Sequence, residues 1–390
     1  MSNHIAIEGF CDSHFNRLKN AFEQNFAGHN STPPELGAAV AVFAGGKPVA
    51  SLWAGYADSA KSKPWKEDSA VCVFSCTKAI VALCAHILVD RNQLDYDKPV
   101  SQYWPEFAQQ EKSAITVRQL MSHQAGLSAI KKPLQPGKVF DWQTVTEALA
   151  GQHPLWKPGT AHGYHTLAFG HLIGELVQRV SGKSLNQFVQ DEITDPLNNR
   201  FLMGFDATKT DYIADLAMPS ESSSMFDICQ QALSADPADF TNFAEPQMLT
   251  PPIVNSSTWR GAIMPGAGGH TSAKSLATIY ASIISDKPLQ GRQLITKQRI
   301  AEMTEVQSLG MDKTLAMNTC WGLGMQLPGA DIEFEAGRSK TAFGHNGMWG
   351  SAGFADPEAD ISFAYVMNQC NESAGDFRVK SLIHAVYDCI

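Results

Sequence analysis

The sequence lacks the motifs of several large classes of protein. It has no Gly-rich phosphate loop followed by Lys-Ser or Lys-Thr, no His-Glu-x-x-His zinc motif and no run of basic residues. The formal net charge is −9, from 30 basic and 39 acidic residues, which argues against binding to nucleic acid. We therefore expect no nucleic-acid partner, no metal and no cofactor, and the charge better suits a small neutral or cationic substrate.

Long apolar runs and paired cysteines are missing as well. The longest apolar stretch, residues 79–89, is interrupted by His86 and is too short to span a bilayer. The first ten residues have neither the basic start nor the apolar segment of a secretory signal. The 8 cysteines form no Cys-x-x-Cys pair, and three of them lie among apolar residues near Ser75, which favours buried thiols. We expect a cytoplasmic protein without a membrane partner, although a cleaved exported protein would share these features.

The most informative stretch is residues 71–89. Residues 71–74 are apolar, as in a buried strand, and residues 76–89 are apolar on nearly every face, as in a helix of the interior. Ser75 then stands at the N-terminus of this helix, where unpaired N–H groups and the helix dipole favour a developing anion. Lys78 lies one turn later on the same side. A desolvated lysine within hydrogen-bond reach helps to remove the proton of a serine hydroxyl, so these two residues are a candidate nucleophile and base.

The Ser-x-x-Lys spacing by itself is a weak signal. The only other instance joins Ser128 to Lys131, which runs into the Pro136-Gly137 turn, so its lysine belongs to a predicted loop. The buried helix that follows Ser75 makes Ser75 the better candidate.

Apolar periodicity and turn residues predict the order of helices and strands. Residues 204–260 show little periodicity and are expected to form a long irregular excursion over the helical region. Helices are expected at residues 10–27, 76–89, 116–126, 167–181, 273–284, 295–303 and 378–388. Strands are expected at residues 37–44, 48–56, 321–327, 351–357 and 361–368, the first two as a hairpin around Gly45-Gly46.

This order predicts an α/β (α+β) fold. Strands near both ends of the chain indicate an antiparallel β-sheet that is flanked by helices and built from both termini, plus a mostly helical inserted domain. The α/β domain is expected to comprise residues 1–84 and 270–390, and the helical domain residues 85–269. The active site is expected at their interface.

Three motifs occur in order: Ser75-Cys-Thr-Lys78, Tyr164-His-Thr166 and His345-Asn-Gly347. Their order and separation resemble the three motifs of the penicillin-recognising serine hydrolases. Within that superfamily the chain most resembles the family VIII carboxylesterases, which are similar in fold to class C β-lactamases and D-Ala-D-Ala carboxypeptidases. The likeness runs over nearly the whole chain and includes residues 120–127, 156–159, 269–273 and 353–357.

The resemblance implies a set of site residues. Ser75 is the expected acylated nucleophile, and Lys78 and Tyr164 are its proton-handling partners. The backbone N–H groups of Ser75 and Met348 are expected to form the oxyanion hole. The expected substrate-binding residues are Thr166, His345, Asn346, Gly347 and Trp349, although Trp349 could equally be part of the core.

Two departures from the usual family motifs favour a neutral ester as substrate. The third motif is most often Lys-Thr-Gly, whereas His345 is mostly neutral at pH 7 and binds a carboxylate less well. The second motif ends in Thr166 where β-lactamases usually have asparagine, which removes an amide that contacts an acylamide side chain. The expected function is a serine esterase that hydrolyses short-chain carboxylic esters through a Ser75 acyl-enzyme.

Other functions stay open. The same fold could act on amides as a β-lactamase or D-amino-acid peptidase, or the chain could be a catalytically silent scaffold, against which the intact Ser75, Lys78 and Tyr164 argue. The histidines His162 and His165 near Tyr164 lack the regular spacing of a helical zinc site. The sequence does not determine the natural ester, the acyl-chain preference, the oligomeric state, or which of Lys78 and Tyr164 is the base.

Overall fold

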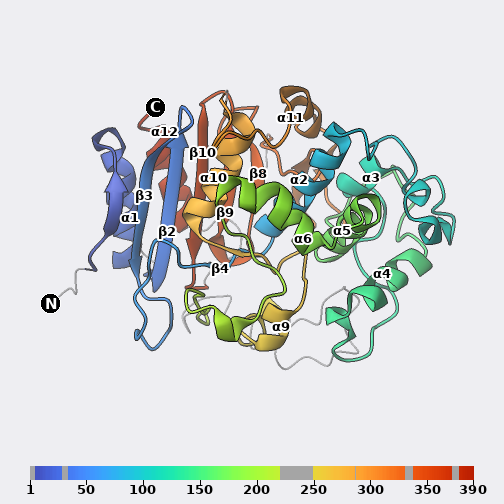
Figure 1. The fold of residues 1–390 in the computed structure, drawn as a ribbon, viewed down its shortest axis with the longest axis horizontal. Helices are drawn as coiled ribbons and strands as arrows, with labels where there is room; N and C mark the ends of the chain where they lie inside the picture. The colour runs from blue at the N-terminus through green and yellow to red at the C-terminus, as the bar shows by residue number, and fades with distance from the viewer. Residues whose placement is uncertain (1–4, 29–33, 220–248, 286, 330–336, 371–376) are drawn as a thin grey trace.

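Strands from the two ends of the chain form the central sheet (Figure 1). The structure is a computed structural model that describes residues 5–28, 34–219, 249–285, 287–329, 337–370 and 377–390. The sheet has 6 strands in the order β1-β3-β2-β10-β9-β8, and all neighbouring pairs are antiparallel. The strands are β1 (Glu8–Cys11), β2 (Gly37–Ala44), β3 (Lys47–Gly55), β4 (Val71–Cys72), β5 (His270–Thr271), β6 (Ser308–Met311), β7 (Asn318–Trp321), β8 (Phe343–Asn346), β9 (Ala352–Asp356) and β10 (Ile361–Met367).

The α-helices of residues 76–189 gather on one side of the sheet (Figure 1). The α-helices are α1 (Asn16–Ala27), α2 (Cys76–Asp90), α3 (Val117–Met121), α4 (Trp142–Gly151), α5 (Ala168–Ser181), α6 (Leu185–Val189), α8 (Pro251–Val254), α9 (Ser257–Gly261), α10 (Ala273–Ile284), α11 (Lys297–Met303) and α12 (Phe377–Tyr387). Within the described residues no helix is both long enough and apolar enough to cross a bilayer.

The β2–β10 ladder joins the two ends of the chain. β2 and β3 form the predicted hairpin around Gly45 and Gly46, which both have positive φ. β2 also pairs along its length with β10, with Ala44 opposite Ile361 at one end. The prediction of an antiparallel sheet built from both termini is therefore confirmed.

Helices cover both faces of this sheet. Ser362 and Tyr365 are three residues apart on β10, so their side chains point to opposite faces. The Ser362 hydroxyl donates a hydrogen bond of 2.9 Å to the Ala277 carbonyl of α10. On the other face the Tyr365 hydroxyl donates to Glu35, which forms an ion pair with Arg378 of α12. α12 packs beside α1, so the first and last helices share that face.

The ion pair between Glu35 and Arg378 is buried, with a distance of 2.9 Å and side chains that are 0% and 1% exposed. Removing one partner of such a pair leaves the other charge in the interior without its counterion. We expect Arg378→Met to lower the free energy of unfolding by about 3–5 kcal/mol in urea titration. Arg17→Met provides the matched control, because its pair with Asp388 is exposed and contributes less than about 1 kcal/mol. Equal losses in the two variants would contradict the prediction.

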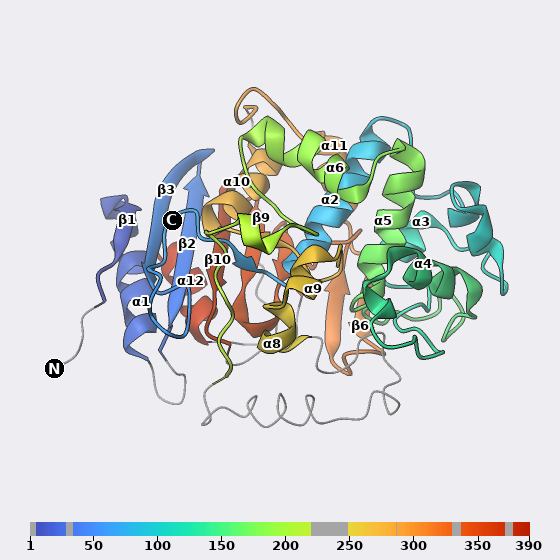
Figure 2. The same ribbon diagram turned by 60° about the horizontal axis from the view of Figure 1, so that its bottom comes forward.

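α2 lies between the sheet and the helical region (Figure 2). Residues 76–89 are all buried, because α2 contacts α5 and α6 on one side and β8 on another. This agrees with the prediction of a helix that is apolar on nearly every face. The pairing of β4 with β5 fixes the approach to α2, since it ties the chain just before the helix to a segment near residue 270.

The predicted helix at residues 10–27 is wrong over its first part. Residues 8–11 instead form β1, and α1 begins only at Asn16. Gly9 has φ 103°, and a Cβ at this position would lie 2.0 Å from the Ser51 carbonyl oxygen of β3. Close pairing with β3 therefore outweighs the local helical pattern.

The predicted helix at residues 116–126 is too long. Thr116 caps α3 as expected and forms a capping box with Gln119. The helix nevertheless ends at Met121, because His123 adopts a left-handed conformation with φ 62° that no helix continues. Gly126, the expected stop, lies in the loop beyond.

The expected irregular excursion at residues 204–260 is described only at its ends, since residues 220–248 lie outside the described residues. Residues 207–209 there form one turn of 3₁₀ helix, and α8 and α9 follow the gap. The division into residues 1–84 with 270–390 and residues 85–269 stays a proposal, and its first boundary falls within α2.

Candidate active site

Ser75 immediately precedes α2, at the point where the chain enters the helix. Phe74 has φ 43°, a left-handed conformation that is uncommon for a non-glycine residue. Just before it, the Val73 N–H donates a hydrogen bond of 2.9 Å to the Gly269 carbonyl. The Ser75 hydroxyl does not cap the helix. It is therefore available to the side chains around it.

Lys78 lies one turn into α2 with its amine beside this hydroxyl. Its Nζ is 3.0 Å from Ser75 Oγ and donates a hydrogen bond of 2.7 Å to the Gly266 carbonyl. Burial lowers the pKa of Lys78 well below its usual value of 10.5, and the nearby Cys76 thiol opposes this shift. Burial thus favours the neutral amine, which is the form that can accept a proton from Ser75.

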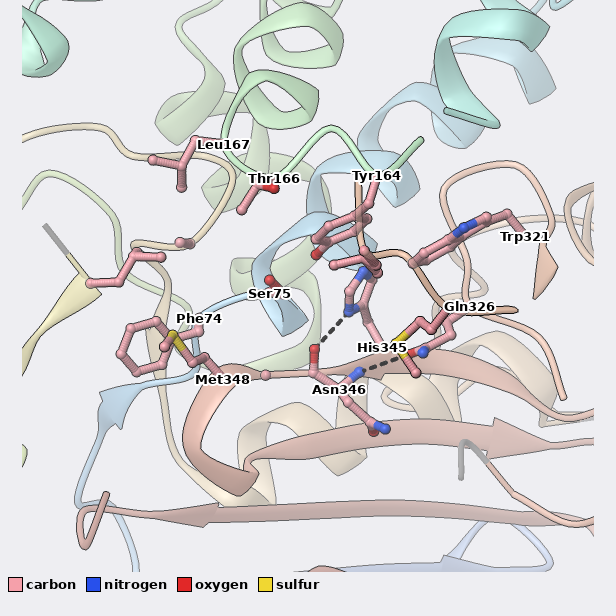
Figure 3. A pocket seen from close by; sticks show the side chains of 15 residues that line it. Phe74, Ser75, Tyr164, Thr166, Leu167, Trp321, Gln326, His345, Asn346 and Met348 are labelled. Carbon is pink, nitrogen blue, oxygen red and sulfur yellow. Dashed lines mark hydrogen bonds between the residues drawn. The ribbon is translucent and has the colours of Figure 1, made fainter. Parts of the chain in front are cut away.

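Tyr164 reaches the same point from the loop that precedes α5, and Figure 3 shows its hydroxyl pointing toward Ser75. Lys78 Nζ lies 4.7 Å from the centre of the tyrosine ring. Burial raises the pKa of Tyr164 above its usual value of 10.0, and a hydrogen bond with the Ser75 side chain acts in the opposite direction. The neutral phenol is therefore favoured, and a neutral phenol can donate a proton.

The third motif lies at the end of β8 and borders the same space (Figure 3). His345 is buried, and its Nδ1 is 2.7 Å from the Asn346 carbonyl oxygen. The Asn346 N–H donates to Gln326 Oε1 at 3.2 Å. Burial lowers the pKa of His345 to about 3, and the proximity of Lys78 adds to this shift. A neutral histidine therefore occupies the first position of the third motif.

Gly347 and the residues after it form the turn beside Ser75. A Cβ on Gly347 would lie 2.3 Å from the Val73 carbonyl oxygen, so the close approach of this strand to the entry of α2 requires glycine. Met348 begins a short 3₁₀ turn and lines the pocket, whereas Trp349 is buried and does not line it. Trp349 has φ 70°, and its indole N–H donates to the Leu249 carbonyl at 3.4 Å.

One pocket of about 300 Å³ brings most of the predicted site residues together. Its wall is formed mainly by apolar side chains, and none of the described residues that line it is lysine or arginine. Lys78 lies beneath Ser75 and does not line it. The residues that line the pocket are Phe74, Ser75, Tyr164, Thr166, Leu167, Leu249, Ala267, Leu315, Met317, Trp321, Gln326, His345, Asn346, Gly347 and Met348.

Sequence reasoning missed the wall formed by the β6–β7 hairpin. Leu315 and Met317 from its loop and Trp321 from β7 all line the pocket. The Trp321 ring stacks on Tyr164, with ring centres 5.2 Å apart and planes inclined by 10°. These residues belong to no motif, and nothing in the sequence indicated that this hairpin reaches the site.

The histidines near Tyr164 are held by separate hydrogen bonds. His165 Nε2 accepts from the Leu127 N–H at 3.1 Å, and His162 Nε2 is 3.0 Å from Thr319 Oγ1. The His123 ring packs against Tyr164, with ring centres 5.1 Å apart. These contacts assign the histidines to the support of the loop that carries Tyr164.

Comparison with known proteins shows the family of this chain. A family model described as Beta-lactamase matches residues 22–387. Esterase/beta-lactamase LipL of Mycobacterium tuberculosis is 31% identical over 369 residues, which cover 93% of this chain and 83% of LipL.

Two solved structures are similar over almost their full length. A penicillin-binding protein homologue from Caulobacter crescentus is 36% identical, with a TM-score of 0.86 over 99% of this chain and 100% of that chain. A family VIII carboxylesterase is 33% identical, with a TM-score of 0.85 over 99% of this chain and 100% of that chain. The chain belongs to the beta-lactamase family.

Proposed function

We propose that this chain is a serine esterase that hydrolyses short-chain carboxylic esters through an acyl-enzyme on Ser75. The observation that carries the proposal is the 3.0 Å distance between Ser75 Oγ and the buried amine of Lys78, at the floor of an apolar pocket. A serine becomes nucleophilic when a neighbouring base takes its proton, and a desolvated lysine meets that need.

The acylation step follows from the protonation states that burial favours. Neutral Lys78 accepts the Ser75 proton as Oγ attacks the ester carbonyl carbon. The negative charge that develops on the carbonyl oxygen is stabilised by the backbone N–H groups of Ser75 and Met348. The C–O bond then breaks, and neutral Tyr164 donates its proton to the leaving alkoxide, so that the alcohol departs and the acyl group stays on Ser75.

Deacylation uses the same two proton carriers. Lys78, protonated in the first step, returns its proton to the Tyr164 phenolate. A water molecule then attacks the acyl carbonyl carbon as Lys78 accepts one of its protons. The bond between this carbon and Ser75 Oγ breaks, and Lys78 passes the proton to Oγ, so that the acid leaves and Ser75 recovers its hydroxyl. The opposite pKa shifts of Lys78 and Tyr164 support this assignment of base and acid.

The pocket supports an ester as the preferred substrate over a β-lactam or a peptide with a free carboxylate. A carboxylate needs a cation or several donors in its site, and the described lining offers a neutral His345 and no lysine or arginine. The volume of about 300 Å³ suits a short acyl chain and lies at the small end of ligand pockets. The name of the family VIII carboxylesterase gives esterase activity, which also favours this choice, whereas the name of LipL gives both esterase and beta-lactamase activity.

The test compares hydrolysis of p-nitrophenyl butyrate by the wild type and by Ser75→Ala at equal folded concentration. Ready turnover that is lost in the variant would support the proposal. Absence of turnover by the folded wild type would refute it as stated and would direct the search to amide substrates.

We expect His345→Lys to shift specificity toward carboxylate-bearing substrates. A lysine at this position adds a cation that can form a charge-assisted hydrogen bond with a β-lactam carboxylate. The ratio of kcat/KM for nitrocefin to that for p-nitrophenyl butyrate should rise about tenfold. His345→Gln is the matched control, because it is polar but uncharged and should leave this ratio near that of the wild type. An equal rise in both variants would show that the charge is not responsible.

A reducing compartment such as the cytoplasm is part of the proposal. The cysteines at positions 11, 72, 76, 84, 320, 370 and 389 are free thiols. Cys229 lies outside the described residues. A protein with this many free thiols is typical of a compartment that keeps cysteines reduced.

A further inference from the structure

We propose that Asp312, on the β6–β7 hairpin, is a positioning residue that holds Tyr164 in place for proton transfer. This inference rests on the role of Tyr164 in the proposed function. Asp312 does not line the pocket and does not contact Ser75, so it acts through the residues that it binds.

The carboxylate of Asp312 binds the backbone of Tyr164 directly. The Tyr164 N–H donates to both carboxylate oxygens, at 2.9 Å to Oδ1 and 3.0 Å to Oδ2. A second backbone contact links the same two segments, since the Lys313 N–H donates to the His162 carbonyl at 3.0 Å. The loop that carries Tyr164 is thus tied to the hairpin at Tyr164 itself and two residues before it.

A second route leads from Asp312 to the tyrosine ring. Asp312 Oδ2 accepts a hydrogen bond of 3.2 Å from the Thr319 hydroxyl, which accepts one of 2.9 Å from the Trp321 indole N–H. Trp321 in turn stacks on the ring of Tyr164. The carboxylate therefore fixes both the backbone of Tyr164 and the surface against which its ring lies.

The same carboxylate shapes the pocket wall. Oδ1 accepts hydrogen bonds from the N–H groups of Thr314 at 2.8 Å and Leu315 at 3.0 Å, at the start of the hairpin loop. Leu315 lines the pocket beside Tyr164. Asp312 thereby sets the distance between the apolar wall and the proton donor.

An aspartate is better suited to this position than an amide. Asp312 is fully buried, every group that binds its carboxylate is a donor, and a carboxylate accepts through both oxygens. Asparagine would have to turn an NH₂ group toward donors on one side. Within the described part of the chain, no salt bridge offsets the charge of Asp312. Burying an unpaired carboxylate is costly, and positioning of a catalytic group accounts for its presence.

The test is a double-mutant cycle of Asp312→Asn and Tyr164→Phe, read as the rate at which a fluorophosphonate labels Ser75. Labelling needs no particular ester, so it reports on the reactive serine even if the natural substrate differs. We expect Asp312→Asn to slow labelling about tenfold or more in the wild-type background, and to cause less than about a twofold change when Tyr164 is already phenylalanine. The labelling rate depends on Tyr164 through its hydrogen bond with the Ser75 side chain. Once the Tyr164 hydroxyl is absent, a shift of its ring has no further effect on Ser75.

Asp356→Asn is the matched control. Asp356 is also fully buried and accepts hydrogen bonds from Ser339 and Tyr387, but it lies on β9 and does not line the pocket. This variant should lose thermal stability and keep the labelling rate of the wild type. If Asp312→Asn does not fold, Thr319→Val is the alternative, because it removes the hydroxyl that links Asp312 to Trp321. This variant should slow labelling only when Tyr164 is present.

The outcomes separate the two proposals. A folded wild type that is not labelled would refute the proposed function. If the wild type is labelled and Asp312→Asn is labelled at the same rate, the positioning role alone is overturned. The same holds if Asp312→Asn slows labelling by the same factor whether residue 164 is tyrosine or phenylalanine.

Discussion

Replacement of Ser75 by alanine is expected to reduce hydrolysis of p-nitrophenyl butyrate by roughly 10⁴-fold or more. The variant removes the only atom that can form the acyl-enzyme, so the oxyanion hole and pocket retain just a small acceleration over water. The fold should tolerate the change, because the Ser75 hydroxyl does not cap α2. The measurement is kcat/KM, together with mass spectrometry of protein quenched during turnover to detect the acyl group on Ser75.

Ser128→Ala is the control for this experiment. Ser128 begins the other Ser-x-x-Lys sequence, but it does not line the pocket, and Lys131 at the end of that sequence is exposed. This variant should keep the activity of the wild type. An acyl group found on Ser128, or substantial turnover by Ser75→Ala, would contradict the assignment of the nucleophile.

Replacement of Lys78 by methionine or arginine is expected to lower kcat by about 10²–10⁴-fold, the usual contribution of a general base. Methionine has no proton acceptor, and arginine stays protonated at every accessible pH. The wild type should lose activity as pH falls through the lowered pKa of Lys78, because protonation removes the lone pair. A variant with full activity, or an unchanged acidic limb of the pH profile, would exclude Lys78 as the base.

The same pKa shift predicts how stability depends on pH. Between the lowered pKa of folded Lys78 and its usual value of 10.5, the unfolded chain binds one proton more than the folded chain. The contribution of Lys78 to stability therefore rises with pH across this window. The melting temperature of Lys78→Met relative to that of the wild type should be highest at low pH and should fall as pH approaches 10.5. Parallel melting curves at all pH values would contradict this expectation.

Much of the site could be predicted because the three motifs carry their own local structure. The apolar residues after Ser75 predict a buried helix, and the helix spacing alone puts Lys78 on the same side as the hydroxyl. The hairpin around Gly45-Gly46 and the alternation in β10 predict strands, and strands at both chain ends predict the sheet. The structure brings Ser75, Tyr164 and His345 to one pocket, as the order of the motifs led us to expect.

The remainder could not be predicted because it depends on contacts between distant segments. Nothing local to Asp312 or Trp321 indicates that the β6–β7 hairpin folds against the loop of Tyr164. In the same way, the strand at residues 8–11 exists because Gly9 lies against Ser51, which overrides a local helical pattern. Trp349 lies beside the third motif in sequence, but the positive φ at that residue turns its side chain into the core.

The pairing of β2 with β10 has a consequence for how the protein is made. β2 is an almost wholly buried, apolar strand, and its partner comes from the opposite end of the chain. During synthesis the β2–β3 hairpin leaves the ribosome long before β10 exists, so one hydrogen-bonding edge of β2 has no native partner. Contacts so distant in sequence form slowly, and an open apolar edge pairs readily with other chains. The risk of aggregation therefore falls on the nascent chain, and chaperones that shield the hairpin until β10 arrives should raise the yield of active enzyme.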